Sequence, residues 1–205
     1  MPCGLVFIRF EGGNIVIVRL ATESDVPVIH NMIQEYVNDG TLLPRTVESL
    51  YRSLPSLVVA DAEGELTGVV ALHRLDNNVA EVRTLTVAKG YQGQGIGQLL
   101  VQYAINLAED TGYHKVISFT TQIEFFSRCG FAVVARNSVP TKYYLDCVHC
   151  SKLFRCDETA MERVLVESPR VSRTAKRYGL QGNRQIIQLH DTVPECEPEA
   201  EAIQD

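Results

Sequence analysis

The chain has 205 residues, a length typical of one globular domain with short additions. Its 45% apolar and 21% charged residues are ordinary for a soluble protein. No apolar run approaches the roughly 20 residues that a membrane span needs. The net charge of −6 argues against a nucleic-acid partner, which usually requires a basic surface.

The beginning of the chain shows no targeting signal. Its apolar patch, residues 5–8, is too short for a signal-peptide core and follows no basic leader. We therefore expect a cytoplasmic protein with no membrane partner. The six cysteines then indicate free thiols or a metal site rather than a disulfide framework.

The first half of the chain alternates between strand and helix patterns. A β-branched run predicts a strand over residues 15–20. Thr22 and Asp25 resemble a capping pair, and apolar pairs that recur every four residues predict a helix that Gly40 ends. A short helix is expected over residues 47–54. Three further strands are expected: over residues 57–60, from residue 69 onward, and over residues 79–87. Turns at 63–65 and 76–78 separate them, so they should form an antiparallel meander.

The second half opens on a glycine-rich turn that leads into a long amphipathic helix, residues 96–110. A strand over 115–120, a short helix over 124–129 and a strand over 131–135 are expected to follow. We expect the domain to cover residues 15–165, after an N-terminal extension of residues 1–14. Residues 166–205 have little apolar periodicity and are expected to form a mobile tail.

The glycine-rich turn is the sharpest local signal and reads Gln92-Gly93-Gln94-Gly95-Ile96-Gly97. Glycines let the backbone turn tightly and approach a ligand, and the first turn of the helix that follows presents unpaired N–H groups suited to phosphate. The spacing matches neither the Rossmann fingerprint nor the P-loop. A flexible surface turn is the alternative, but the strand before the turn and the helix after it favour a phosphate site.

This turn and the order of elements resemble the GNAT superfamily of N-acetyltransferases. The signature of that family, Gln or Arg followed by spaced glycines, falls on Gln92, Gly95 and Gly97. The resemblance implies an α/β fold whose mixed, mostly antiparallel central sheet is flanked by helices, with splayed strands that hold acetyl-CoA. It also implies that the pantetheine arm pairs near Leu85 and Val87. The residues implied to bind the CoA pyrophosphate are Gln92, Gly93, Gln94, Gly95, Ile96 and Gly97.

A narrower resemblance is to the short-form N-acetylglutamate synthases, single-domain enzymes at the head of arginine biosynthesis. Residues 40–45, 80–83, 119–121 and 146–158 carry it. It implies transfer of an acetyl group to the α-amino group of L-glutamate. Two alternatives stay open: another acceptor, such as glutamine or a protein N-terminus, and a non-catalytic acyl-CoA-binding protein.

Direct acetyl transfer needs a base, a polarised thioester carbonyl and a departing thiolate. Glu81 lies on the strand that leads to the expected thioester, so it is the candidate base, and a backbone N–H near Val87 is the candidate oxyanion donor. Many members of the superfamily carry a tyrosine acid where this chain has Phe126. Tyr143 and Tyr144 are alternative proton donors, and the acid stays unassigned.

A dicarboxylate acceptor requires cations, and the planar guanidinium group suits a carboxylate. Arg45 and Arg83 are the first candidates and Lys142 and Lys152 the next, while Ser151 is implied by the resemblance. Arg83 has the strand parity of Glu81, so both side chains should share one face unless a bulge intervenes. The expected partner is therefore a small amino acid, and assembly into a homo-oligomer stays open.

The last motif is a group of cysteines. Cys147, Cys150 and Cys156 have a spacing that suits a zinc knuckle, but a second complete pair is absent. Free cysteine also packs well as a small apolar side chain. We therefore expect no metal site and keep zinc as the alternative.

Overall fold

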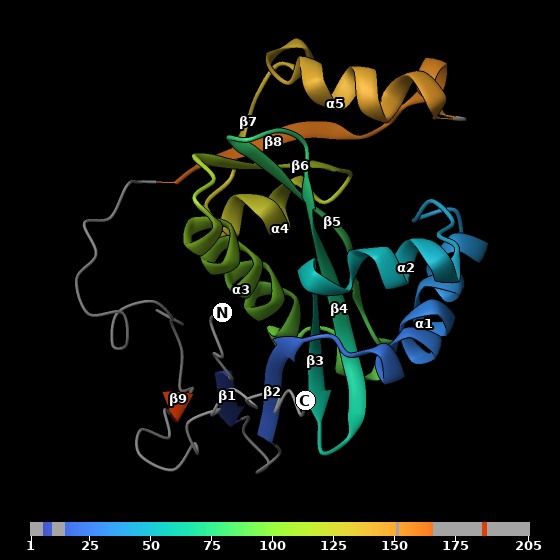
Figure 1. The fold of residues 1–205 in the computed structure, drawn as a ribbon, viewed down its shortest axis with the longest axis vertical. Helices are drawn as coiled ribbons and strands as arrows, with labels where there is room; N and C mark the ends of the chain where they lie inside the picture. Colours follow the sequence, from blue (N-terminus) through green and yellow to red (C-terminus); the bar gives the residue numbers. More distant parts are fainter. Residues whose placement is uncertain (1–5, 10–14, 151, 166–185, 188–205) are drawn as a thin grey trace, which may run out of the picture.

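The computed structural model describes residues 6–9, 15–150, 152–165 and 186–187. These residues form one nine-stranded sheet in the order β7-β8-β6-β5-β4-β3-β2-β1-β9 (Figure 1). Only β5 and β6 pair in parallel, and every other neighbouring pair is antiparallel. The strands are β1 (Val6–Arg9), β2 (Ile15–Leu20), β3 (Leu57–Ala62), β4 (Glu65–Arg74), β5 (Val79–Val87), β6 (Lys115–Thr120), β7 (Ala132–Val133), β8 (Thr159–Val164) and β9 (Ile186–Ile187).

Helices cover both faces of this sheet. The helix α3 (Ile96–Thr111) lies on one side, while α1 (Val26–Asn38) and α2 (Val47–Ser53) lie on the other (Figure 1). Alternation along β3 explains the two layers, because Val58 belongs to the core beneath α3 and Val59 to the core beneath α1. The remaining α-helices are α4 (Ile123–Arg128) and α5 (Pro140–Leu145). The expected α/β fold is confirmed.

The entry to α1 follows the predicted capping pair. The Asp25 carboxylate accepts a hydrogen bond from the Thr22 backbone N–H at 2.7 Å and another from the Thr22 hydroxyl at 2.9 Å. Arg19, on β2, joins it at 2.6 Å and also reaches Asp61 on β3 at 2.9 Å. The network fixes the direction in which the chain leaves the sheet to enter α1.

The two parallel strands separate beside the expected thioester position. β5 pairs with β6 only over residues 79–81, so the rest of β5 has no strand partner on that side. On its other side β5 pairs with β4, and the register between these two strands shifts between Val69 and Ala71 of β4, opposite residues 84–85 of β5. At this shift Thr84 adopts a positive φ of 61°. Such a bulge bends and twists a strand. The splayed strands that the family resemblance implied are therefore present.

Some elements differ from the sequence prediction. The strand expected over residues 131–135 covers only Ala132–Val133, the two residues that pair with β8. The strand β8 and the helix α5 were not predicted. β8 lies between β6 and β7, and its two charged side chains, Glu162 and Arg163, masked its strand pattern.

The sheet also extends past the expected domain boundaries. Residues 6–9, which the sequence assigned to an extension, pair with β2. Residues 186–187, within the expected tail, pair with β1. The other residues of the expected mobile tail, 166–185 and 188–205, lie outside the described part of the chain.

Candidate functional site

Glu81 is a buried carboxylate in the middle of the sheet, and only 2% of the residue is exposed. It lies on β5 directly opposite His73 of β4, so the two side chains share the face covered by α1 and α2. Its Oε2 atom accepts a hydrogen bond from Lys142 Nζ at 2.8 Å. Beyond Glu81, β5 no longer pairs with β6. A buried carboxylate with a charged partner at such a place is a candidate for proton transfer.

The helix α5 brings Lys142 to this carboxylate, and Asp146 is its C-cap residue. Lys142 Nζ also donates to Asp146 Oδ2 at 2.7 Å, across one helical turn. Arg83 Nη1 lies 3.5 Å from Asp146 Oδ2 and 3.9 Å from Glu81 Oε2. Glu81 and Arg83 therefore share one face, as their strand parity predicted, because the bulge follows Arg83 rather than separating the two.

The protonation states follow from burial and from these contacts. Burial raises the pKa of Glu81, although Lys142 and Arg83 partly oppose the rise. Burial alone would lower the pKa of Lys142, but the charges of Glu81 and Asp146 and the hydrogen bonds to them raise it. Burial lowers the pKa of His73 to about 4, helped by the charge of Arg83, so this imidazole is neutral at pH 7.

Arg45 lies near the same group of charges, in the loop before α2. Its guanidinium donates to the Ser49 hydroxyl at 2.8 Å and the Ser53 hydroxyl at 2.8 Å, and it reaches the Thr84 hydroxyl at 3.5 Å. Burial, with the charge of Arg83 in addition, lowers the pKa of Arg45 to about 10. Among the described residues no carboxylate forms a salt bridge with Arg45, so this cation lacks an anionic partner.

The glycine-rich turn has the backbone that the sequence predicted. Gly93 and Gly95 have positive φ angles of 73° and 86°, and Gly95 is the N-cap of α3. The Gln92 side chain donates to Tyr36 Oη at 2.7 Å and to the Val87 carbonyl at 3.2 Å. Tyr36 donates to the same carbonyl at 2.6 Å. The turn is thereby fixed against the end of β5 and against α1.

Comparison with known proteins decides the family. The model of the acetyltransferase (GNAT) family matches residues 29–131. The chain belongs to the GNAT family. An uncharacterized N-acetyltransferase from Chlorobaculum tepidum is 32% identical over 148 residues, which are 72% of this chain and 96% of that protein.

Two further proteins narrow the comparison. An amino-acid acetyltransferase from Mycobacterium tuberculosis is 32% identical over 131 residues, 62% of this chain and 75% of that protein. The structure of N-acetylglutamate synthase from Neisseria gonorrhoeae, complexed with coenzyme A and N-acetyl-glutamate, superposes with a TM-score of 0.65 at 24% identity. It covers 74% of this chain and 35% of that one, and this likeness shows the fold.

Phe126 is a core residue in this GNAT domain. Its ring packs edge-on against Phe125 and Phe131, with both ring centroids 5.2 Å away, and it is buried beneath α3. The alternative donors Tyr143 and Tyr144 pack against each other and are exposed. None of these contacts assigns the general acid.

The segment after α5 holds the remaining predicted residues. Lys152 donates to the Gly40 carbonyl at 3.0 Å and forms no salt bridge within the described residues. Ser151 lies outside the described residues. The structure joins this segment to the end of α1 through Lys152.

The three cysteines of the zinc alternative show no metal-binding arrangement in the described residues. Cys147, Cys150 and Cys156 are free thiols. Within the described part of the chain, no group of three or more His, Cys, Asp or Glu side chains is arranged to hold a metal ion. The zinc alternative therefore has no support in these residues.

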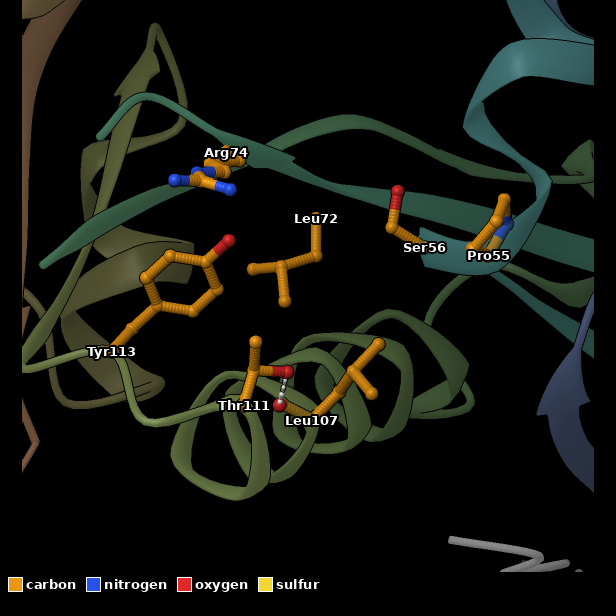
Figure 2. Close-up of a pocket in the computed structure, with 7 residues that line it drawn as sticks. All are labelled: Pro55, Ser56, Leu72, Arg74, Leu107, Thr111 and Tyr113. Carbon is orange, nitrogen blue, oxygen red and sulfur yellow. Dashed lines mark hydrogen bonds between the residues drawn. The ribbon is translucent and has the colours of Figure 1, made fainter. Parts of the chain in front are cut away.

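A hollow on the other side of the sheet is lined by none of the predicted site residues. Figure 2 shows the side chains that line it, with Arg74 and Tyr113 at one end, Pro55 and Ser56 at the other, and Leu72 and Leu107 between them. Its volume is about 180 Å³. Arg74 there donates to the Asn77 side chain.

In the described residues no helix has the length and apolar character of a membrane span.

Sequence reasoning missed three residues that contact the candidate site residues: His73, Asp146 and Tyr36. Period-two parity between neighbouring strands would place His73 beside Glu81, but only after the register is known. Asp146 follows Lys142 by four residues, a spacing that pairs opposite charges on a helix. That signal was available, but α5 itself was not predicted.

Proposed function

We propose that this protein transfers the acetyl group of acetyl-CoA to the α-amino group of L-glutamate. Membership of the GNAT family makes acetyl-CoA the acetyl donor. The observation that carries the proposal is the buried Glu81 carboxylate with Lys142 and Arg83 around it, on the strand that leads into the glycine-rich turn. It combines a base with cations for carboxylates at one place.

The donor would bind along β5 and the start of α3. The amides of residues 92–97 would bind the pyrophosphate, since the glycines leave room and the helix N-terminus favours negative charge. The pantetheine arm would pair near Leu85 and Val87, where β5 has lost β6 as a neighbour. The thioester then lies toward Glu81 on the same strand.

The reaction would proceed by direct attack. Glu81 accepts a proton from the acceptor ammonium, directly or through a water molecule, and the amine attacks the thioester carbonyl. A backbone N–H near Val87 stabilises the oxyanion. The carbon–sulfur bond then breaks and coenzyme A leaves as a thiolate, which an unperturbed thiol pKa of about 8.5 makes tolerable without a tyrosine acid. The extra proton on the newly acylated nitrogen passes to the thiolate or to solvent, which leaves the neutral amide.

The acceptor would be a small dicarboxylate. Arg45 and Arg83 suit its two carboxylates, and Lys142 adds a third positive charge beside Glu81. A relative is named amino-acid acetyltransferase, and the fold is that of a synthase solved with N-acetyl-glutamate. The narrower resemblance to short-form synthases supports a role in arginine biosynthesis, which we propose takes place in the cytoplasm.

Release of coenzyme A, measured with a thiol reagent across a panel of amino acids, tests this function. We expect glutamate to be the best acceptor and mass spectrometry to identify N-acetylglutamate. Glutamine or a peptide N-terminus as the best acceptor would replace glutamate and leave the reaction class unchanged. A protein that binds acetyl-CoA and acetylates no amine would contradict the enzymatic proposal.

A further inference from the structure

Arg83 has more capacity for hydrogen bonding than its neighbours use. Its two nearest carboxylates lie at 3.5 Å and 3.9 Å, longer than a well-formed charge-assisted bond of about 2.8 Å. Its Nε atom is buried and has no hydrogen-bond partner in the described structure. Because a guanidinium presents five donors in a planar fork, Arg83 can donate two short hydrogen bonds to one carboxylate.

Asp146 is the carboxylate that lies closest to this unused capacity. It belongs to the segment that follows α5, 63 residues away from Arg83 in the chain. Lys142 holds it at 2.7 Å, and the charge of Arg83 adds to that contact. Burial alone would raise its pKa, but the Lys142 hydrogen bond and the two cations lower it, so Asp146 is ionised.

Exposure divides the group into an inner and an outer part. The side chains of Glu81 and Lys142 are 3% and 12% exposed, whereas those of Arg83 and Asp146 are 28% and 32% exposed. A ligand from solvent therefore reaches Arg83 and Asp146 first. The Lys142–Glu81 contact lies behind them and can persist while the outer contact is exchanged.

We propose that Asp146 occupies the place that a carboxylate of the acceptor takes on Arg83 and Lys142. The inference rests on the proposed function in that the ligand is an amino acid with a carboxylate. Binding then exchanges one carboxylate for another on the same cations, without leaving a buried cation unpaired. Asp146 thus sets the affinity for the acceptor as an internal competitor.

An internal competitor lowers the apparent affinity for the ligand. That affinity equals the intrinsic affinity multiplied by the fraction of molecules in which Asp146 leaves the cations free. Removing its charge should therefore tighten binding of any carboxylate ligand, about 3- to 10-fold for a competitor that occupies the place most of the time. A merely structural role for Asp146 predicts the opposite sign. If Asp146 only held Lys142 and α5 in position, its loss would weaken the site.

The experiment is a calorimetric titration of the full-length protein with glutarate, a dicarboxylate that lacks an amine. Asp146→Asn keeps the shape and removes the charge, Asp146→Ala removes the group, and Asp146→Glu retains a carboxylate. Asp157→Asn is the matched control, because it removes a charge from the same segment at an exposed position. Thermal unfolding establishes that each variant is folded.

We expect glutarate to bind 3- to 10-fold more tightly to Asp146→Asn and Asp146→Ala, with Asp146→Glu and Asp157→Asn close to the unchanged protein. Equal or weaker binding to the folded Asp146→Asn protein, or no binding to any variant, would overturn the inference. Turnover is measured separately. A protein that acetylates no amino acid yet binds glutarate more tightly without the Asp146 charge would contradict the proposed function and support this inference.

Discussion

Burial and ion pairing act on Glu81 in opposite directions. Burial raises its pKa and so makes the carboxylate a better proton acceptor, while Lys142 and Arg83 favour the charged form. The proposed base must be ionised when the acceptor binds. A raised folded-state pKa means that the ionised fraction of Glu81 falls as the pH drops through that pKa, so turnover should fall with it.

The replacement Glu81→Gln tests this role, because it keeps the side-chain shape and removes the basicity. We expect kcat/KM to fall about 100-fold at pH 7, and the deficit to shrink at high pH, where more of the acceptor amine is neutral. Steady-state rates across pH 6–10 measure both effects. Asp146 remains as a partner for Lys142, so the fold should survive.

The matched control is Glu162→Gln, which removes the same charge from an ion pair with Lys115; Glu162 lies on β8, two strands from Glu81 in the same row of the sheet. Its rate should stay within about twofold of the unchanged protein, since such partly exposed pairs contribute little. Normal turnover in Glu81→Gln, with an unchanged pH profile, would exclude Glu81 as the base.

At the scale of elements, α3 has glycine at both ends. Gly95 caps its N-terminus with φ 86° and Gly112 caps its C-terminus with φ 92°. An alanine in this left-handed conformation costs about 1–2 kcal/mol at either end. Only Gly95 belongs to the proposed phosphate site, so the pair separates a loss of stability from a loss of binding.

We expect Gly95→Ala to weaken acetyl-CoA binding at least 10-fold, because the added methyl group and the altered amides disturb the phosphate site. Gly112→Ala should lower the free energy of unfolding by about 1–2 kcal/mol, the same as Gly95→Ala. It should leave the affinity for acetyl-CoA unchanged. Calorimetry with acetyl-CoA and denaturant unfolding measure the two quantities. Equal affinities in both folded variants would show that the pyrophosphate binds elsewhere.

The entry to α1 predicts a pH dependence of stability. Burial alone would raise the pKa of Asp25, but hydrogen bonds from Arg19 and Thr22 lower it to about 2. A lowered folded-state pKa contributes stability above the unfolded pKa of about 3.8, and that contribution is lost as the pH falls through about 2.

We therefore expect Asp25→Asn to destabilise the protein by about 1–2 kcal/mol at pH 7, with the difference shrinking toward pH 2. Urea unfolding at several pH values between 2 and 7 measures it. The exposed Asp157→Asn variant serves as the control, with a difference near zero throughout. A destabilisation by Asp25→Asn that is independent of pH would exclude the ion pair as its cause.

At the scale of the whole molecule, periodicity predicted the layers. Strand alternation divides the core into one part beneath α3 and another beneath α1, and each helix face followed its 3.6-residue repeat. The bulge at Thr84 was not predictable, because a register shift depends on the pairing with β4. The sequence therefore predicted the splayed strands only through the family resemblance.

The same limit applies to the site. Glu81, Arg83 and Lys142 were predicted from residue type, strand parity and resemblance, and the structure brings them together. Asp146 and His73 join them only through long-range contacts, with Asp146 63 residues from Arg83. No local pattern reports such a contact, and the short α5 that produces it has too few residues for a helical period to stand out.

The acceptor depends on the charge balance of the whole site. Arg45 is half-buried without a carboxylate partner among the described residues, and Arg83 lacks a close one. One arginine would bind the α-carboxylate that all amino acids share, which leaves the other for a side-chain carboxylate. Glutamine would leave that cation unpaired, a cost of about 2 kcal/mol, so we expect kcat/KM for glutamate to exceed that for glutamine about 30-fold.

Specificity constants for glutamate, glutamine, aspartate and leucine measure this preference, and Arg45→Gln should reduce it. Glutamine equal to or better than glutamate would exclude the proposed acceptor and leave the assignment as an acetyltransferase in place.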